Sequence, residues 1–149
     1  MQVFERNGVH IHYSEEGDPN GAPLVFSSPL GTDMRLWDEI MPLLAEGVRI
    51  IRYDMRGHGL TDCPDAPYTM GALISDAEAL LEYLNVHDCL FVGLSIGGMI
   101  AQGLATKRLD LIRAMVLSNT AAKIATPEIW QNRIDSIRKN GMGQYQMLV

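Results

Sequence analysis

Gly93-Leu94-Ser95-Ile96-Gly97-Gly98 is the stretch of sequence that decides the fold. It lies between the apolar residues 89–92, which are typical of a buried strand, and residues 96–106, which are expected to form a helix. A G-x-S-x-G pattern in this context predicts a very sharp turn with the serine at its tip. The flanking glycines lack the Cβ atoms that would clash in such a turn, so the hydroxyl of Ser95 is expected to be an exposed nucleophile.

A glycine-rich turn that opens a helix can also bind phosphate, and a nucleotide site is therefore the alternative. Ser95 stands where a dinucleotide-binding fingerprint has its second glycine, which allows the pyrophosphate to approach closely. The Gly-Lys-Ser/Thr sequence of a P-loop is missing as well. These details favour the nucleophile over a structural or phosphate-binding turn.

Nucleophilic attack by Ser95 on a carbonyl would create an oxyanion that needs amide donors. The helix that begins at Ile96 directs its amino-terminal amides toward this position. The second donor is expected from residues 27–32, which follow the third expected strand. Pro29 has no N–H group, so the sequence predicts the amide of Leu30 as the partner of the Ile96 amide. A plain turn over residues 27–32 stays open as the alternative.

Expected strands and helices alternate along the rest of the chain, which predicts an α/β protein with a mostly parallel sheet and helices on both faces. Asn7-Gly8 suits a type I′ turn and predicts an opening β-hairpin formed by residues 3–6 and 9–13. Beyond Asn119 the sequence becomes polar and is expected to leave the sheet. The other expected strands are residues 24–26, 49–53, 89–92 and 113–117, and the expected helices are residues 37–44, 70–84 and 96–106.

Composition excludes several classes of protein. The 149 residues are 47% hydrophobic and 20% charged, as in a globular domain, and the net charge of -6 with scattered basic residues argues against nucleic acid or a membrane as a partner. A cytoplasmic protein is expected, because the sequence shows neither a membrane-spanning apolar run nor a signal peptide. Cys63 and Cys89 lack metal-ligand spacing and are expected to be free thiols, with Cys89 in the core.

The general base of the expected site is missing from the sequence. In hydrolases with this serine turn, the acid and the histidine follow the nucleophile, whereas all 4 histidines precede Ser95. His58 lies in a glycine-flanked turn, where a structural role is expected. His87 begins the strand whose far end carries Ser95, roughly 15–20 Å away. Asn119, where some hydrolases have the acid, is neutral.

With these residues identified, the chain resembles the 3-oxoadipate enol-lactonase branch of the α/β-hydrolase fold from its first strand to about residue 140. Residues 54–59, Asp-Met-Arg-Gly-His-Gly, and the turn at Ser95 are shared with the wider family. Residues 28–33, Ser-Pro-Leu-Gly-Thr-Asp, and residues 118–124, Ser-Asn-Thr-Ala-Ala-Lys-Ile, are more specific to the branch. Residues 126–130, Thr-Pro-Glu-Ile-Trp, and Arg133 continue this similarity.

The resemblance implies hydrolysis of a small cyclic enol-lactone that bears a carboxylate, in bacterial catabolism of aromatic compounds, without a metal or an organic cofactor. Serine at position 95 argues against the related dehalogenases, whose nucleophile is a carboxylate. We expect Arg133 to bind the substrate carboxylate beside Trp130 as an apolar wall, because residues three apart share a helix face. A solvated arginine next to a core tryptophan is the alternative.

Residues 1–119 are expected to form the amino-terminal part of the hydrolase core, and residues 120–149 the start of a cap. The family's acid and histidine would then lie in a missing carboxyl-terminal half. Two interpretations stay open: part of an enol-lactonase, small-ester hydrolase or cofactor-free haloperoxidase relative, or a non-catalytic truncated or frameshifted product that acts as a binding module. Residues 141–149 depart from the branch, which suits a frameshift. Self-association through the apolar strand at residues 113–117 is expected in the chain alone.

Overall fold

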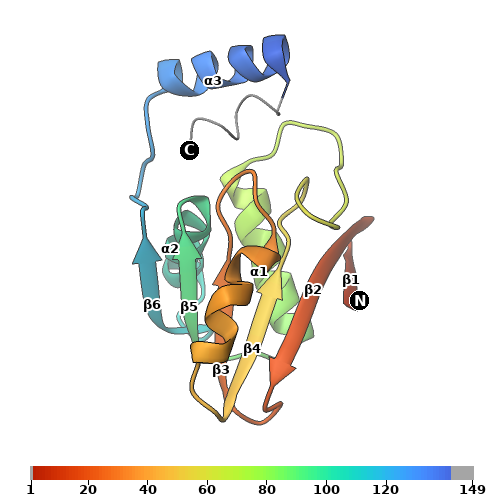
Figure 1. Ribbon diagram of the computed structural model, residues 1–149, viewed down its shortest axis with the longest axis vertical. Coiled ribbons are helices and arrows are strands. Elements are labelled where there is room, and N and C mark those ends of the chain that lie inside the picture. Colours follow the sequence, from red (N-terminus) through yellow and green to blue (C-terminus); the bar gives the residue numbers. More distant parts are fainter. Residues whose placement is uncertain (1, 142–149) are drawn as a thin grey trace.

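The computed structural model describes residues 2–141 and contains one six-stranded sheet with the strand order β1-β2-β4-β3-β5-β6 (Figure 1). The first two pairings, β1 with β2 and β2 with β4, are antiparallel, and the remaining three are parallel. The predicted mostly parallel sheet is therefore confirmed. The strands are β1 (Gln2–Arg6), β2 (Val9–Gly17), β3 (Ala22–Ser27), β4 (Val48–Tyr53), β5 (Cys89–Leu94) and β6 (Ile112–Ser118).

The predicted hairpin is present, and its second strand is longer than the sequence indicated. Asn7 and Gly8 have φ angles of 49° and 77°, which a type I′ turn requires at both central positions. β2 continues to Gly17 because its polar half pairs with β4, where Arg49 Nε donates a 2.6 Å hydrogen bond to Glu15 Oε1. Glu15 by itself disfavours a strand, and its ion pair with Arg49 compensates its charge.

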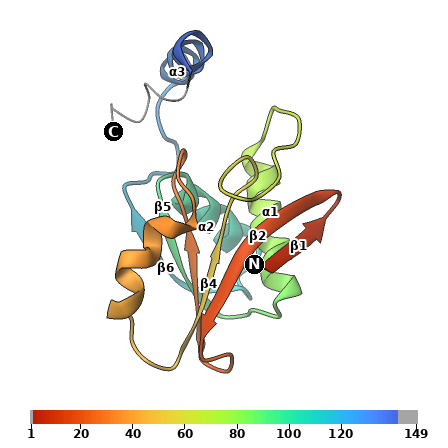
Figure 2. The same cartoon turned by 45° about the vertical axis from the view of Figure 1, so that its right-hand side comes forward.

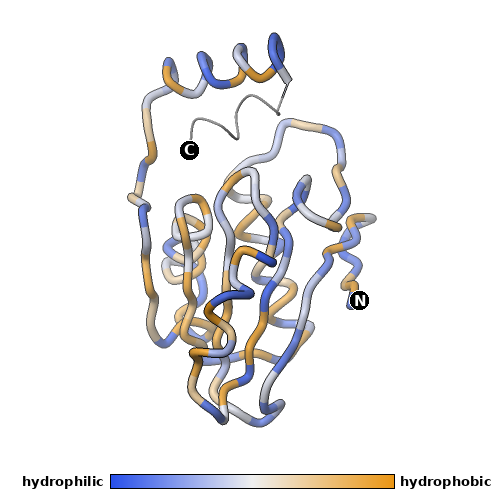
Figure 3. Tube along the Cα trace, in the orientation of Figure 1, coloured by the Kyte–Doolittle hydropathy of each residue, from blue (hydrophilic) through white to orange (hydrophobic). Residues whose placement is uncertain are grey.

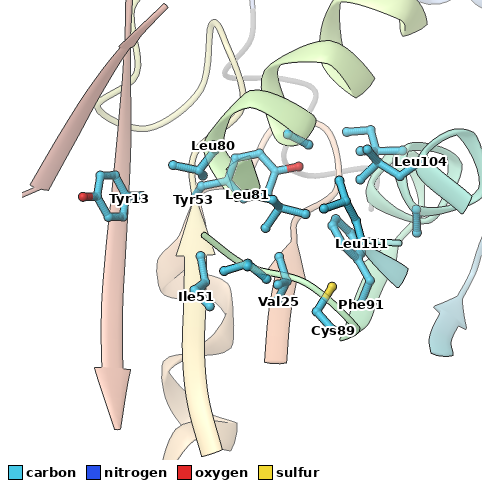
Figure 4. Packing of buried hydrophobic residues seen from close by; sticks show 14 of the residues in the cluster. Tyr13, Val25, Ile51, Tyr53, Leu80, Leu81, Cys89, Phe91, Leu104 and Leu111 are labelled. Carbon is cyan, nitrogen blue, oxygen red and sulfur yellow. The ribbon is translucent and has the colours of Figure 1, made fainter. Parts of the chain in front are cut away.

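Helices cover both faces of the sheet. α1 (Met70–Tyr83) and α2 (Ile96–Lys107) lie on one face, and the short helix η1 (Met34–Leu43) lies on the other (Figures 1 and 2). Because side chains alternate along a strand, each inner strand contributes to two clusters. Val25, Ile51 and Phe91, each 0% exposed, point toward the leucines of α1 and α2 (Figure 4). Their neighbours pack with Trp37 of η1 on the opposite face.

The predicted helix at residues 37–44 exists, but it is a 3-10 helix that begins at Met34. Asp33 fixes its start by accepting a hydrogen bond from the Arg35 amide. Pro42 has no N–H group to donate to a helical ladder, and the helix ends one residue later at Leu43. The apolar spacing predicted the contact with the core correctly, whereas the type of helix was not predicted.

Beyond β6 the chain leaves the sheet as expected and forms α3 (Pro127–Asn140), which lies past the carboxyl ends of the parallel strands (Figures 1 and 2). Thr126 caps this helix and none of its residues is buried. Whether residues 120–149 begin a cap stays a prediction, and residues 142–149 lie outside the described part. Within residues 2–141, every helix is too short or too polar to cross a bilayer.

β6 forms one edge of the sheet and is unusually apolar for that position. Met115, Val116 and Leu117 are 36%, 47% and 43% exposed, and Figure 3 shows hydrophobic residues along this edge. Among the described residues, no strand pairs with its outer side. The arrangement agrees with the apolar edge expected for residues 113–117.

Candidate active site

Ser95 occupies a strained turn between β5 and α2. Its φ of 55° and ψ of −115° lie outside the regions that residues with a Cβ normally adopt. Its amide donates a 2.9 Å hydrogen bond to the Ser118 carbonyl, and its own carbonyl accepts hydrogen bonds from the Gly98 amide and the Thr120 hydroxyl, at 3.0 and 2.6 Å. The hydroxyl makes no hydrogen bond as a cap of α2. These hydrogen bonds to the backbone thus maintain the strained conformation of Ser95 and leave its side chain available.

The glycines around Ser95 are required by close packing. A Cβ on Gly93 would lie 2.5 Å from the carbonyl oxygen of Gly97, and one on Gly97 would overlap the carbonyl oxygen of Ser27. On Gly98 a Cβ would meet the Thr120 side chain at 2.5 Å. Three segments, the end of β3, the turn at Ser95 and the residues after β6, therefore converge with no space for side chains between them.

The structure places the two predicted oxyanion donors on adjacent segments. Ser27 pairs with Gly93, so the loop after β3 begins beside the turn at Ser95. The Leu30 and Ile96 amides donate to no acceptor within residues 2–141. Both amides are therefore available for a ligand, and their role as an oxyanion hole stays a prediction.

Residues 54–58, at the carboxyl end of β4, hold this loop in place. The Gly31 amide donates to His58 Nε2 at 3.0 Å, and the Met34 amide donates to Asp54 Oδ1 at 2.8 Å. Ser28 Oγ accepts a 3.0 Å hydrogen bond from Trp37 Nε1. Sequence reasoning missed these contacts. The position of Asp54 directly after a buried strand was the available signal, because such carboxylates gather at one sheet edge.

The buried histidine of the chain is too distant to serve as a base for Ser95. His12 and Asp54 are 8% and 2% exposed, and His12 Nδ1 lies 2.8 Å from Asp54 Oδ2. This pair lies at the edge of the sheet that also carries Ser95, but β4 and β3 separate β2 from β5. Three strand spacings amount to roughly 14 Å. A direct proton transfer is therefore excluded in this arrangement.

The other three histidines are engaged elsewhere. His10 Nδ1 contacts Asp62 at 2.8 Å, and His87 precedes β5 at the end opposite Ser95, with Asp110 at 4.0 Å. His58 is bonded to Gly31, which agrees with its expected structural role. At the end of β6, the neutral Asn119 accepts a 2.8 Å hydrogen bond from the Ser118 hydroxyl. The four histidines thus all have other partners, and the residue directly after β6 is not an acid.

Trp130 and Arg133 lie together on α3, as their spacing predicts. The Cζ atom of Arg133 lies 5.3 Å from the centroid of the Trp130 ring. Trp130 Nε1 donates a 2.8 Å hydrogen bond to the Ile124 carbonyl, which fixes the indole against the segment that leads into the helix. α3 is on the same side of the sheet as the carboxyl ends of β5 and β6 (Figure 1). Substrate binding by either residue stays a prediction.

Burial keeps two titratable groups near the strands in their neutral form. It raises the pKa of Tyr53 far above the usual value, and the Tyr53 hydroxyl lies 2.9 Å from Ser27 Oγ. Burial also raises the pKa of the Cys89 thiol to about 12, so both groups stay neutral well into the alkaline range and not only at neutral pH. Both cysteines are free thiols, as predicted. Among residues 2–141, no three His, Cys, Asp or Glu side chains gather as metal ligands.

The strand order, the glycine-packed turn and the serine at its tip define an α/β-hydrolase. Residues 22–147 match the α/β-hydrolase fold family, and the chain belongs to this family. It is 34% identical over 134 residues to 3-oxoadipate enol-lactonase 2 of Acinetobacter baylyi, covering 90% of this chain and 50% of that protein. The crystal structure of the enol-lactonase from Burkholderia xenovorans LB400 superposes with a TM-score of 0.91 at 36% identity, covering 97% of this chain and 56% of that one.

A non-heme chloroperoxidase of Streptomyces lividans is 36% identical over 99 residues, which cover 64% of this chain and 35% of that protein. The resemblance to enol-lactonases drawn from the motifs is confirmed at this level of identity. The chain spans about half the length of the two enol-lactonases of Acinetobacter baylyi that it matches.

Proposed function

We propose that this chain is the nucleophile-bearing part of a serine hydrolase that opens a small lactone with a carboxylate substituent. The observation that carries the proposal is the strained turn at Ser95, whose side chain does not cap α2; the unengaged amides of Leu30 and Ile96 on adjacent segments support it. The names of the similar enol-lactonases indicate 3-oxoadipate enol-lactone as the substrate.

In the proposed reaction, Ser95 Oγ attacks the lactone carbonyl while a base takes the hydroxyl proton. The Leu30 and Ile96 amides stabilise the negative oxygen, after which the ring C–O bond breaks and the proton passes to the departing enol oxygen. Water then hydrolyses the acyl-enzyme. The base must be a histidine that follows Ser95, and all 4 histidines of the sequence precede it.

The proposal therefore requires the acid and the histidine from a carboxyl-terminal half, supplied in cis. Without a base, oxyanion donors and binding alone would leave only ~10³- to 10⁴-fold acceleration over water. No metal or organic cofactor takes part in the proposed reaction.

Arg133 is proposed to bind the substrate carboxylate, and Trp130 to form an apolar wall beside it. The contact with the Trp130 ring supports this role, because a guanidinium can lie against an aromatic ring and its fork of N–H groups matches the geometry of a carboxylate. In the complete enzyme, Arg133→Ala should lower kcat/KM for the charged lactone roughly 10- to 100-fold more than for a neutral ester. Arg138→Ala, in the last turn of the same helix, is the matched control. Equal losses on both substrates would reject the assignment.

Two alternatives have support. Similarity to a chloroperoxidase over 99 residues favours an esterase or a cofactor-free haloperoxidase relative. Hydrolysis of neutral esters in preference to the lactone would support this first alternative. The missing base within residues 2–141 favours a non-catalytic binding module. A coding sequence that continues without a histidine-bearing segment would select that alternative.

The decisive experiment determines the gene together with the DNA downstream of residue 149, and expresses the complete reading frame. Lactone hydrolysis by the complete protein is expected, with Ser95→Ala lowering kcat about 10⁴- to 10⁶-fold. Ser136→Ala, on an exposed face of α3, should leave kcat unchanged. Residues 1–149 alone should show no comparable turnover. Retention of more than a tenth of the activity by Ser95→Ala would overturn the proposal.

A further inference from the structure

His58 is held between two backbone groups whose chemistry determines its protonation. Its Nε2 lies 3.0 Å from the Gly31 amide nitrogen, and its Nδ1 lies 3.2 Å from the Arg56 carbonyl oxygen. An amide can only donate a hydrogen bond and a carbonyl can only accept one. The two contacts together therefore select the neutral imidazole with its proton on Nδ1 and a lone pair on Nε2.

The contact between His58 and Gly31 adjoins the peptide group that carries the Leu30 N–H, the proposed oxyanion donor of the Ser95 site. The Thr32 hydroxyl donates a 3.0 Å hydrogen bond to the Pro29 carbonyl, which belongs to the same peptide group as the Leu30 N–H. Because a trans peptide is planar, a bond that fixes this carbonyl makes the Leu30 N–H point the opposite way. His58 fixes the next peptide group through Gly31, whose φ of 77° is left-handed. Leu30 is thus held from both sides.

His58 also decides which amide stays available. The Gly31 N–H is consumed by the imidazole, whereas the Leu30 N–H donates to no acceptor within residues 2–141. Met34, at the far end of the loop, is bonded to Asp54. The loop is therefore attached at two points to the segment that follows β4.

We propose that His58 is a positioning residue: as a neutral acceptor it holds the Leu30–Gly31 peptide with the Gly31 amide engaged, so that the Leu30 amide, and not the Gly31 amide, stays available to the reaction site. The orientation itself is a property of this chain, and its importance for catalysis rests on the proposed function. His58 acts only through the loop and does not touch the substrate.

The first test uses the ¹⁵N-labelled chain of residues 1–149 and measures the exchange of the Gly31 amide by NMR. His58→Ala should accelerate exchange at Gly31 on the order of tenfold, because the acceptor is lost. His58→Gln should restore slow exchange, because its Oε1 can accept a hydrogen bond near the position of Nε2. His10→Ala, which removes an exposed histidine bonded to Asp62, is the control and should leave Gly31 unchanged.

Unchanged exchange in His58→Ala would overturn the proposal, as would an Nε2-protonated imidazole in the ¹⁵N spectrum of the original chain. If His58→Ala does not fold, fast exchange at Gly31 in a folded His58→Gln would overturn it as well. In the complete enzyme, His58→Ala should lower kcat about 10- to 100-fold with little change in KM, and His58→Gln should recover it. If His58→Ala accelerated exchange at Gly31 but left kcat unchanged, the result would support the positioning of the loop by His58. It would overturn the proposed oxyanion role of the Leu30 amide.

Discussion

The hydroxyl of Thr120 donates a 2.6 Å hydrogen bond to the carbonyl oxygen of Ser95. Thr120 follows β6, and the end of this strand also accepts the Ser95 amide through the Ser118 carbonyl. The nucleophile turn is thus closed from the outside by a segment that comes 25 residues later in the chain. Its strained geometry depends on the docking of β6 as much as on its own glycines.

Replacing Thr120 with valine tests this closure, because valine keeps the shape and removes the hydroxyl. Thr120→Val should lower the free energy of unfolding by about 1 kcal/mol, the usual value of one internal hydrogen bond. Thr106→Val removes an exposed hydroxyl that bonds within α2 to Gly103, and it should cost less. Urea unfolding followed by circular dichroism measures both values. Equal costs would show that the bond to Ser95 has no special importance.

Ser95→Gly should stabilise the chain while it removes the nucleophile. Glycine adopts the observed φ of 55° without steric cost, and release of this strain is worth on the order of 1 kcal/mol after the greater entropy of glycine in the unfolded chain is subtracted. Ser95→Ala keeps the Cβ atom and should show no such gain. Thermal unfolding of the three proteins gives the comparison. A similar gain in both variants would point away from backbone strain.

Gly97→Ala should be strongly destabilising, by roughly 3 kcal/mol or more, because the new Cβ would overlap the backbone of β3 at Ser27. Gly71→Ala is the matched control, since the nearest atom to its Cβ would be Thr69 Oγ1 at 3.7 Å. In that exposed first turn of α1, alanine should stabilise by up to about 1 kcal/mol. Soluble yield and urea unfolding distinguish the two. A folded Gly97→Ala with unchanged stability would contradict the packing described around Ser95.

The two cysteines should differ sharply in reactivity. Cys63 is exposed, whereas Cys89 is buried and its pKa is raised to about 12 by that burial. Because only the thiolate reacts, Cys89 should stay unmodified by iodoacetamide at pH 8 until the chain unfolds. Mass spectrometry of the native and the urea-unfolded chain should show one and two modified cysteines. Rapid modification of Cys89 in the native chain would mean that the core opens locally.

The apolar edge at β6 predicts self-association of residues 1–149. Sedimentation velocity should show species larger than the monomer that increase with concentration, because an unpaired apolar strand binds other chains. Val116→Lys introduces a charge into this edge and should shift the distribution toward the monomer. Leu109→Lys changes a residue that is 80% exposed outside any strand, and it should have little effect. A monomer at all concentrations would contradict the prediction.

Local patterns explain which elements were predicted. Residues that are neighbours in the sequence determine the Asn7-Gly8 hairpin, the buried strands and the turn at Ser95. The backbone preferences and the apolar spacing of these neighbours therefore predict the elements. The polar half of β2 was not predicted, because Glu15 and Glu16 belong to a strand only when Arg49 and Arg52 of β4 face them.

By itself, the sequence determined the class of fold, the position of the nucleophile and the absence of a histidine after Ser95. Only the tertiary structure decided which groups hold the site: His58 at Gly31, Asp54 at Met34 and Thr120 at Ser95. These pairs are separated by 27, 20 and 25 residues. Each of these hydrogen bonds requires the parallel strands to be aligned, with their carboxyl ends in one register. The donor and acceptor atoms must be placed to within about a few tenths of an ångström, and no local sequence pattern encodes that placement.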